Sequence, residues 1–340
     1  MNKRSRHLLT SRRIHTCQKL AGLVCAIVLW TTACGSHPQA KIAVIPQTEG
    51  NMLWDPAHAG VEVGADRTGT SIYWNSPTRL DDVEAQIALV DRVADGNFQG
   101  LVLAPDQALS LIAPVRRALA HGIPTVIIGS PLAIPAGGNL SYILNDDAEG
   151  GRMAARRVAE LLNGHGTVAL LGINPDIIGI MIRARAFEKF LAENDPDIRI
   201  VEKRMGTFNE AHEQQAAEET LNGNPHLDVI VGLMWPTIDG TLSALNTSRE
   251  NRSVKIIGFD PMGSPPFEKE NLDCAIQQNT RSMGEQAIES IYARRLGKSV
   301  PGLIYVRPTL INRQNIDSPE IRLITSADWK LGHWDWSPAQ

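Results

Sequence analysis

Short apolar segments alternate with longer amphipathic segments along most of the chain. Residues 41–46 form the first apolar segment, and a helical stretch that ends near Arg67 follows it. In the next amphipathic segment the apolar residues recur at the spacing of one helix face, namely Val83, Ile87, Val90 and Ala94. Each unit of one strand and one helix takes about 25 to 30 residues, the length of a βα repeat. The pattern predicts parallel strands joined by crossover helices.

The expected strands fall into two successive series, which indicates two doubly wound α/β lobes. They are continuous apolar runs, as is typical of parallel sheets that helices cover on both faces. After 41–46, the strands of the first series are 70–74, 100–103 and 125–128, and those of the second are 167–171, 198–203, 229–231, 254–258 and 273–277. Helices are expected over 181–192 and 211–221, and other helices end at His121-Gly122 and Asn163-Gly164. Ligands of such sheets bind beyond the carboxyl ends of the strands, where we therefore look for a site.

The composition is that of an ordinary globular protein. The chain has 340 residues, of which 43% are hydrophobic and 21% charged, so it can bury a core and divide into two domains. Its net charge of -4, with acidic and basic residues mixed, produces no broad positive field. Nucleic acid is therefore not an expected partner.

The N-terminus has the order of an export signal. Basic residues from Lys3 to Lys19 precede an uncharged apolar run over 20–30, which is about half of the ~20 residues that a membrane-spanning helix needs. We expect residues 1–33 to be a signal peptide that is removed, and the mature protein to be periplasmic or otherwise extracytoplasmic. A permanent span is the less favoured alternative.

The sequence from Thr31 to Ser36 resembles the bacterial lipobox, in which a small residue precedes a cysteine that becomes lipidated. Here that cysteine is Cys34, with 34–40 as a linker to the lipid anchor, although Thr31 stands where leucine is usual. The alternative is a conventional cut near Ala33 that leaves Cys34 an ordinary thiol. Cys17 and Cys25 leave with the signal, so no disulfide framework is expected.

Motifs of enzymes and cofactor sites are missing from the sequence. It contains no Gly-x-Ser-x-Gly elbow, no phosphate loop, no dinucleotide fingerprint and no His-Glu-x-x-His. The histidines are scattered, so we expect no metal site. Because the motifs above are missing, we also expect no cofactor and no catalysis. The adjacent Asp146 and Asp147 are interpreted as a helix N-terminal cap, and Cys274 as a small buried apolar residue.

Several strand-end stretches together resemble the ribose-binding and lac-repressor-like periplasmic binding family. They are KIAVIPQTEGNMLW, FQGLVLAPD, HGIPTVIIG, YILNDDAEGGRMAA, IRARAFEKF, VKIIGFD and LDCAIQQNTRSMGEQA, in the family order and over nearly the whole mature chain. The resemblance implies two lobes joined by a three-segment hinge near Asn145, Gln278 and Arg307. The N-terminal lobe would comprise 41–145 plus 279–306, and the C-terminal lobe 146–278 plus 307–327, before a tryptophan-rich tail over 328–340.

The resemblance also implies a ligand site between the lobes. Carried over position by position, the expected ligand-binding residues are Asn51, Trp54, Arg183, Phe208, Met234, Trp235, Asp260 and Gln278. Their types suit a sugar or polyol, because charged groups bond hydroxyls and aromatic faces cover C–H surfaces. Alternatives remain: Asp260 as a helix cap, Trp54 and Phe208 as core residues, and Arg183 in a surface salt bridge.

This chain also departs from the sugar binders of the family. It has Gly129-Ser130 where Asp-Arg is common, Met234-Trp235 where Asn-Asp is common, and Leu53 where an aromatic residue is usual. Fewer polar anchors indicate a larger or less hydroxylated ligand than a simple pentose.

The expected function is the capture of a small polar ligand for an ABC permease, by a monomer that touches the membrane only through its lipid anchor. A periplasmic sensor that feeds a chemoreceptor or sensor kinase is the alternative. Transcriptional regulation is disfavoured, because an export signal stands in place of a helix-turn-helix. The tail contains Trp329, Trp334 and Trp336. We expect it to pack on the surface of a lobe; the alternatives are a flap over the cleft and a contact with a partner.

Overall fold

A computed structural model describes residues 40–48, 53–79, 81–247, 253–261, 267 and 269–328. They belong to one unit of the chain, Ala40–Gln340. The expected signal peptide, Cys34, Asn51 and tail residues 329–340 lie outside the described residues. Within those residues no helix is both long enough and apolar enough to cross a bilayer.

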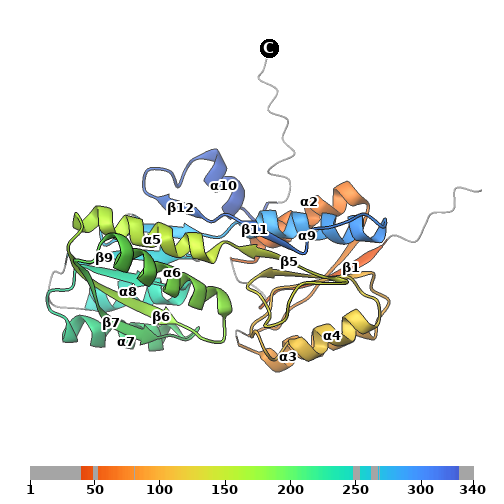
Figure 1. Ribbon diagram of the computed structural model, residues 1–340, viewed down its shortest axis with the longest axis horizontal. Coiled ribbons are helices and arrows are strands. Elements are labelled where there is room, and N and C mark those ends of the chain that lie inside the picture. Colours follow the sequence, from red (N-terminus) through yellow and green to blue (C-terminus); the bar gives the residue numbers. More distant parts are fainter. Residues whose placement is uncertain are drawn as a thin grey trace, which may run out of the picture. The chain divides into compact units, whose positions relative to one another are not determined.

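The N-terminal lobe is a parallel sheet between two pairs of helices. Its strands are β1 (Lys41–Ile45), β2 (Ser71–Trp74), β3 (Gly100–Leu103), β4 (Thr125–Gly129), β5 (Leu140–Asn145) and β11 (Leu303–Val306), in the order β11-β5-β4-β3-β1-β2. Figure 1 shows α2 (Asp55–Thr68) and α9 (Thr280–Arg295) on one side of this sheet, and α3 (Val83–Ala94) and α4 (Ile112–Ala120) on the other.

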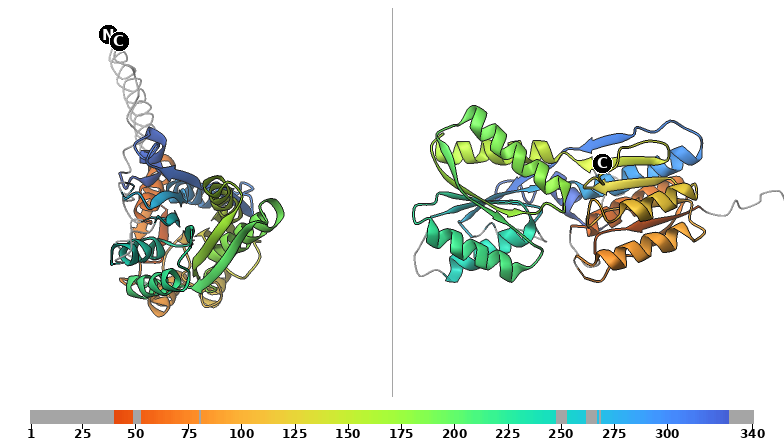
Figure 2. Two further views of the ribbon diagram at one scale, coloured as in Figure 1. Left: turned by 90° about the vertical axis from the view of Figure 1, so that its left-hand side faces the viewer. Right: turned by 60° about the horizontal axis from the view of Figure 1, so that its bottom comes forward.

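The C-terminal lobe repeats this plan. Its strands are β6 (Gly166–Ile173), β7 (Ile198–Met205), β8 (Val229–Gly232), β9 (Lys255–Phe259), β10 (Leu272–Gln277) and β12 (Thr309–Asn312), in the order β12-β10-β9-β8-β6-β7. Helices α5 (Asp147–Leu162) and α6 (Ile178–Asn194) cover one face (Figures 1 and 2), and α7 (Glu210–Gly223) and α8 (Trp235–Thr247) cover the other. The short helix α10 is Pro319–Thr325.

Each sheet is buried on both faces, as the continuous apolar runs predict. Along β1, Ile42 and Val44 pack towards α2 and α9, whereas Ala43 and Ile45 pack towards α3 and α4. Edge strand β7 instead begins with a buried residue and then alternates exposed and partly buried residues. The two doubly wound lobes of the sequence prediction are therefore present.

The chain passes between the sheets three times, after β5, after β10 and after β11. Only Arg307 and Pro308 separate β11 from β12, which is too short for the crossover that a parallel strand needs. Strand β12 therefore runs antiparallel to β10. The strands β5, β11 and β12 were not predicted, because the prediction relied on helices between strands. No helix separates β11 from β12, and β5 follows β4 through a loop alone.

Candidate functional site

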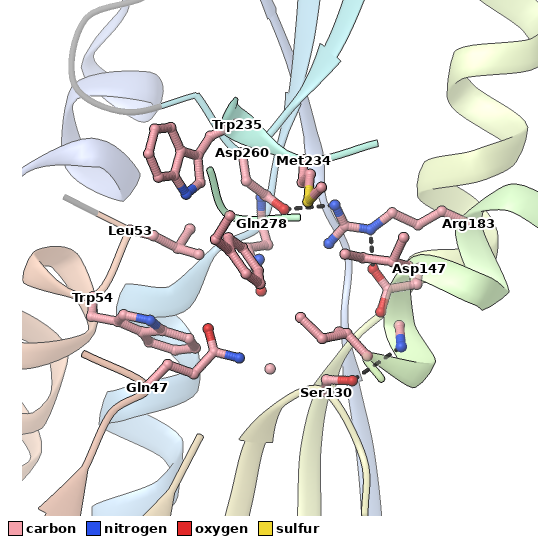
Figure 3. A pocket seen from close by; sticks show the side chains of 15 residues that line it. Gln47, Leu53, Trp54, Ser130, Asp147, Arg183, Met234, Trp235, Asp260 and Gln278 are labelled. Carbon is pink, nitrogen blue, oxygen red and sulfur yellow. Dashed lines mark hydrogen bonds and ion pairs between the residues drawn. The ribbon is translucent and has the colours of Figure 1, made fainter. Parts of the chain in front are cut away.

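A pocket lies where the strand ends of the two lobes face each other, and its cavity volume is about 50 Å³. The N-terminal lobe contributes Gln47 after β1, Leu53 and Trp54 before α2, and Gly129 and Ser130 at the end of β4. The C-terminal lobe and hinge contribute Asp147, Ile177, Gly179, Ile180, Arg183, Phe208, Met234, Trp235, Asp260 and Gln278. Figure 3 shows most of these side chains converging on one space.

Arg183 is the centre of a buried ionic group. It lies on α6 and is 5% exposed. Its Nε donates to Asp147 Oδ1 at 2.7 Å, and its Nη1 lies 2.7 Å from Asp260 Oδ2 and donates to the Leu233 carbonyl oxygen at 3.0 Å. The guanidinium also lies 4.7 Å from the centre of the Phe259 ring. The position of Arg183 excludes the alternative of a surface salt bridge.

Both carboxylates of this group are held by the hinge segments. Asp147, the first residue of α5, accepts a hydrogen bond from Asn145 Nδ2 at 2.7 Å. Asp260 follows β9 in a left-handed conformation, with φ of 53°, and its Oδ1 accepts from the backbone N–H of Gln278 at 3.0 Å. Burial raises the pKa of Asp147, while the charge of Arg183 acts to lower it. The ionic group therefore joins α6 to two of the three hinge segments.

Apolar and aromatic side chains form the other walls. Trp54 is 3% exposed and Trp235 is 8% exposed, yet neither indole Nε1 has a hydrogen-bond partner in the described part of the chain. Trp54 lies against Gly129, where a Cβ would come 3.0 Å from the indole Cη2. Gly129 also has a φ of 78°, which favours glycine. Two unpaired N–H donors thus lie in largely apolar walls.

Glu213 connects the segments that carry two of these walls. This carboxylate is fully buried on α7, where it accepts from the Thr207 N–H at 2.7 Å and from Thr237 Oγ1 at 2.8 Å. Thr207 precedes Phe208, and Thr237 lies in the first turn of α8, which begins with Trp235. Glu213 therefore connects the segments that carry these two aromatic residues.

The two lobes are also bonded to each other beside the pocket. The backbone N–H of Gly179 on α6 donates to Ser130 Oγ at 3.0 Å, and the N–H of Ala108 donates to the carbonyl oxygen of Asp176 at 3.3 Å. Ser130 and Ala108 belong to the N-terminal lobe, and Gly179 and Asp176 to the other. The structure therefore has the lobes closed on each other.

Carboxylates gather close to the second of these contacts. Asp106 is 5% exposed and its Oδ2 has no hydrogen-bond partner among the described residues. Burial and the charges of Asp81 and Asp82 raise the pKa of Asp106 to about 7. Burial and the charge of Asp176 raise the pKa of Asp81, so like charges oppose one another where the lobes meet.

Most of the expected ligand-binding residues lie together in this pocket. Those described are Trp54, Arg183, Phe208, Met234, Trp235, Asp260 and Gln278, whereas Asn51 is outside the described residues. That these residues bind a ligand stays a prediction. Gln47 and Ile180 also line the pocket but were not among the predicted site residues. The position of Gln47 just after a strand and the helix periodicity around Ile180 could have indicated them.

One interpretation of the sequence is wrong. Asp146 does cap α5, since its Oδ1 accepts from the Glu149 N–H at 2.9 Å. Asp147 does not share that role, because its side chain turns to Arg183 and lines the pocket. Adjacent side chains point in different directions at a helix start, so one residue caps and the other faces α6.

No group of three or more His, Cys, Asp or Glu residues in the described ranges is placed to hold a metal ion. Cys274 is completely buried in the core of the C-terminal lobe, and burial raises the pKa of its thiol. It is therefore the small apolar core residue that its sequence context predicts.

Two α/β lobes with one pocket between their strand ends, joined by three hinge segments, define a binding protein that encloses a small ligand. Comparison with known proteins gives the family. Residues 42–299 match the model of the periplasmic binding protein domain, and the chain belongs to that family.

Relatives and solved structures agree with this assignment. The chain is 24% identical to a D-allose-binding periplasmic protein of Escherichia coli, over 83% of this chain and 92% of the relative. It is 25% identical to a xylitol-binding protein of Mycolicibacterium smegmatis, over 69% of this chain and 67% of the relative. An ABC transporter solute-binding protein of Agrobacterium vitis, solved with α-D-tagatopyranose, matches with a TM-score of 0.76 and 24% identity, over 83% of this chain and 98% of its own.

Proposed function

We propose that this protein is the extracytoplasmic substrate-binding component of an ABC importer, and that it encloses a small sugar or polyol between its lobes. The observation that carries the proposal is the pocket in which the buried side chains of Arg183, Asp147 and Asp260 face Trp54 of the opposite lobe. Charged groups that bond hydroxyls on one side, with an aromatic side chain on the other, suit a ring with polar edges and apolar faces.

Binding works through lobe closure. A ligand that touches side chains of both lobes favours the closed form, since only that form makes all the contacts at once. The bonds from Gly179 to Ser130 and from Ala108 to Asp176 form only when the lobes are together. The closed form then presents the ligand to the permease, and the ligand leaves unchanged.

The relatives support this class of ligand and its uptake. They include proteins named for binding D-allose and xylitol and a ribose import binding protein of Bacillus subtilis. In our proposal the lobes divide as 41–145 with 279–306 and 146–278 with 307–327. The protein acts as a monomer that Cys34 anchors to the membrane after the signal peptide is removed.

The ligand can be identified from the protein itself. We would denature the purified protein, identify the released small molecules by mass spectrometry, and titrate ligand-free protein with pentoses, hexoses and polyols by calorimetry. We expect a sugar or polyol to bind in a one-to-one complex and to be recovered unchanged. Chemical turnover of the ligand, or failure of every sugar and polyol to bind, contradicts the proposal.

A variant locates the binding site. Asp260→Ala should weaken binding by about 2–4 kcal/mol, because Arg183 and the Gln278 N–H are left in the pocket without their partner. Asp317→Ala is the matched control, since its side chain is 87% exposed on the same lobe. Equal affinity of the two variants contradicts the assignment of the pocket.

A further inference from the structure

The charges in the pocket wall do not balance. Among the described lining residues, the charged side chains are Asp147, Arg183 and Asp260, which sum to one excess negative charge when all are ionised. All three side chains are at most 6% exposed. Solvent therefore screens the excess charge poorly, and a ligand that enters the pocket experiences it at close range.

Arg183 cannot serve as a free anchor for an anion. Its Nε and Nη1 are occupied by the two aspartates and by the Leu233 carbonyl oxygen. Nη2 has no hydrogen-bond partner among the described residues, and in Figure 3 it faces the open space of the pocket. An anionic ligand could reach this nitrogen only while it lies next to both carboxylates.

Asp147 is the less fully bonded of the two carboxylates. Its Oδ1 holds both Arg183 and Asn145, whereas its Oδ2 has no hydrogen-bond partner in the described ranges. Gly179 leaves room beside this oxygen, because a Cβ there would come within 2.4 Å of Oδ2. Asp260 differs, since its two oxygens accept from Gln278 and pair with Arg183.

We propose that this pocket selects its ligand by charge, accepting a neutral or amine-bearing sugar and rejecting the corresponding sugar acid, and that Asp147 sets this selection. The inference rests on the proposed function, since it concerns the same pocket. Beyond the proposed function, it states which class of sugars the pocket excludes and that Asp147 is responsible for the exclusion.

The test uses sugars that share one skeleton and differ in charge. We would titrate the whole mature protein with D-galactose, D-galactosamine and D-galacturonate, and with the matching glucose series, at a pH where the amine is protonated and the acid ionised. We expect each sugar acid to bind on the order of 100-fold more weakly than its neutral parent, and the amine at least as tightly as the parent. Added salt should change these ratios little, because the pocket is buried.

Two adjacent variants isolate the role of Asp147. Asp147→Asn keeps an oxygen for Arg183 and Asn145 and removes the charge, so the discrimination between neutral sugar and acid should fall about tenfold or more. Asp146→Asn is the matched control, because it changes the neighbouring residue and leaves an oxygen to cap α5. Thermal unfolding would check that both variants are folded.

The outcomes separate the two proposals. Binding of a sugar acid as tightly as its neutral parent overturns charge selection and leaves the proposed function intact. Unchanged discrimination in Asp147→Asn overturns the role of Asp147. Failure of all neutral sugars in the broader calorimetric panel removes the proposed function, and charge selection with it.

Discussion

Removing the guanidinium of Arg183 should cost both stability and ligand binding. In Arg183→Ala, Asp147 and Asp260 lose their shared counter-ion, and in the wild type both side chains are at most 6% exposed. Breaking a buried ion pair in this way typically costs about 3–5 kcal/mol. Asn145 and the Gln278 N–H still bond the two carboxylates, so we expect the lower end, about 3 kcal/mol.

The loss should depend on pH in a defined direction. Without Arg183, burial and mutual repulsion raise the pKa values of both carboxylates above those in the unfolded chain. The folded variant then binds more protons than the unfolded one, so its stability falls as pH rises. The difference from the wild type should therefore shrink as the pH is lowered from about 7 towards 5.

Urea unfolding followed by circular dichroism, at several pH values and without ligand, measures both effects. Arg185→Ala is the matched control, because Arg185 is exposed on the same helix and the substitution is identical. A stability of about 5–15 kcal/mol is usual for a domain, so we expect the variant to remain folded in water. Equal unfolding midpoints for Arg183→Ala and Arg185→Ala would show that the ionic group does not stabilise the fold.

Three further substitutions have expected outcomes. Trp235→Phe removes an unpaired indole N–H and should weaken binding by about 1 kcal/mol in calorimetry. An unchanged affinity means that the ligand does not accept a hydrogen bond from this N–H. Gly129→Ala should destabilise the fold more than Gly122→Ala, since both glycines have positive φ but only Gly129 touches Trp54. Equal losses of unfolding free energy in urea contradict this prediction. The pKa of Asp106 is raised to about 7, so the contribution of this group should lower wild-type stability as the pH rises from about 4 to 7, by at most about 4 kcal/mol. Asp106→Asn should abolish that fall. An identical pH profile of stability in the variant contradicts the prediction.

The sequence was a good guide to the elements whose burial is uniform. Strand β3 matches the expected range in full, and helix α3 begins and ends where the apolar spacing indicates. Both elements are short stretches whose apolar pattern reflects one or two buried faces. Residues close together in the chain are therefore enough to predict them.

The candidate site could be predicted only in part. The family resemblance indicated Trp54, Arg183 and Asp260, and the strand-end rule indicated only where the site lies, because parallel strands end at the same edge of a sheet. They did not indicate that Asp147 pairs with Arg183, 36 residues away in the chain. At the start of a helix an aspartate is equally suited to capping, and local sequence does not distinguish the two roles.

Local sequence thus determined which segments are strands and helices, how they alternate, and that two lobes follow one another, because these properties depend on residues close together in the chain. The tertiary structure alone decided that β12 runs antiparallel and that Glu213 connects the segments carrying Phe208 and Trp235. It also decided that one guanidinium shares two buried carboxylates. These contacts join distant segments, and they exist only once the chain has crossed between its sheets and the crossings have fixed which side chains meet.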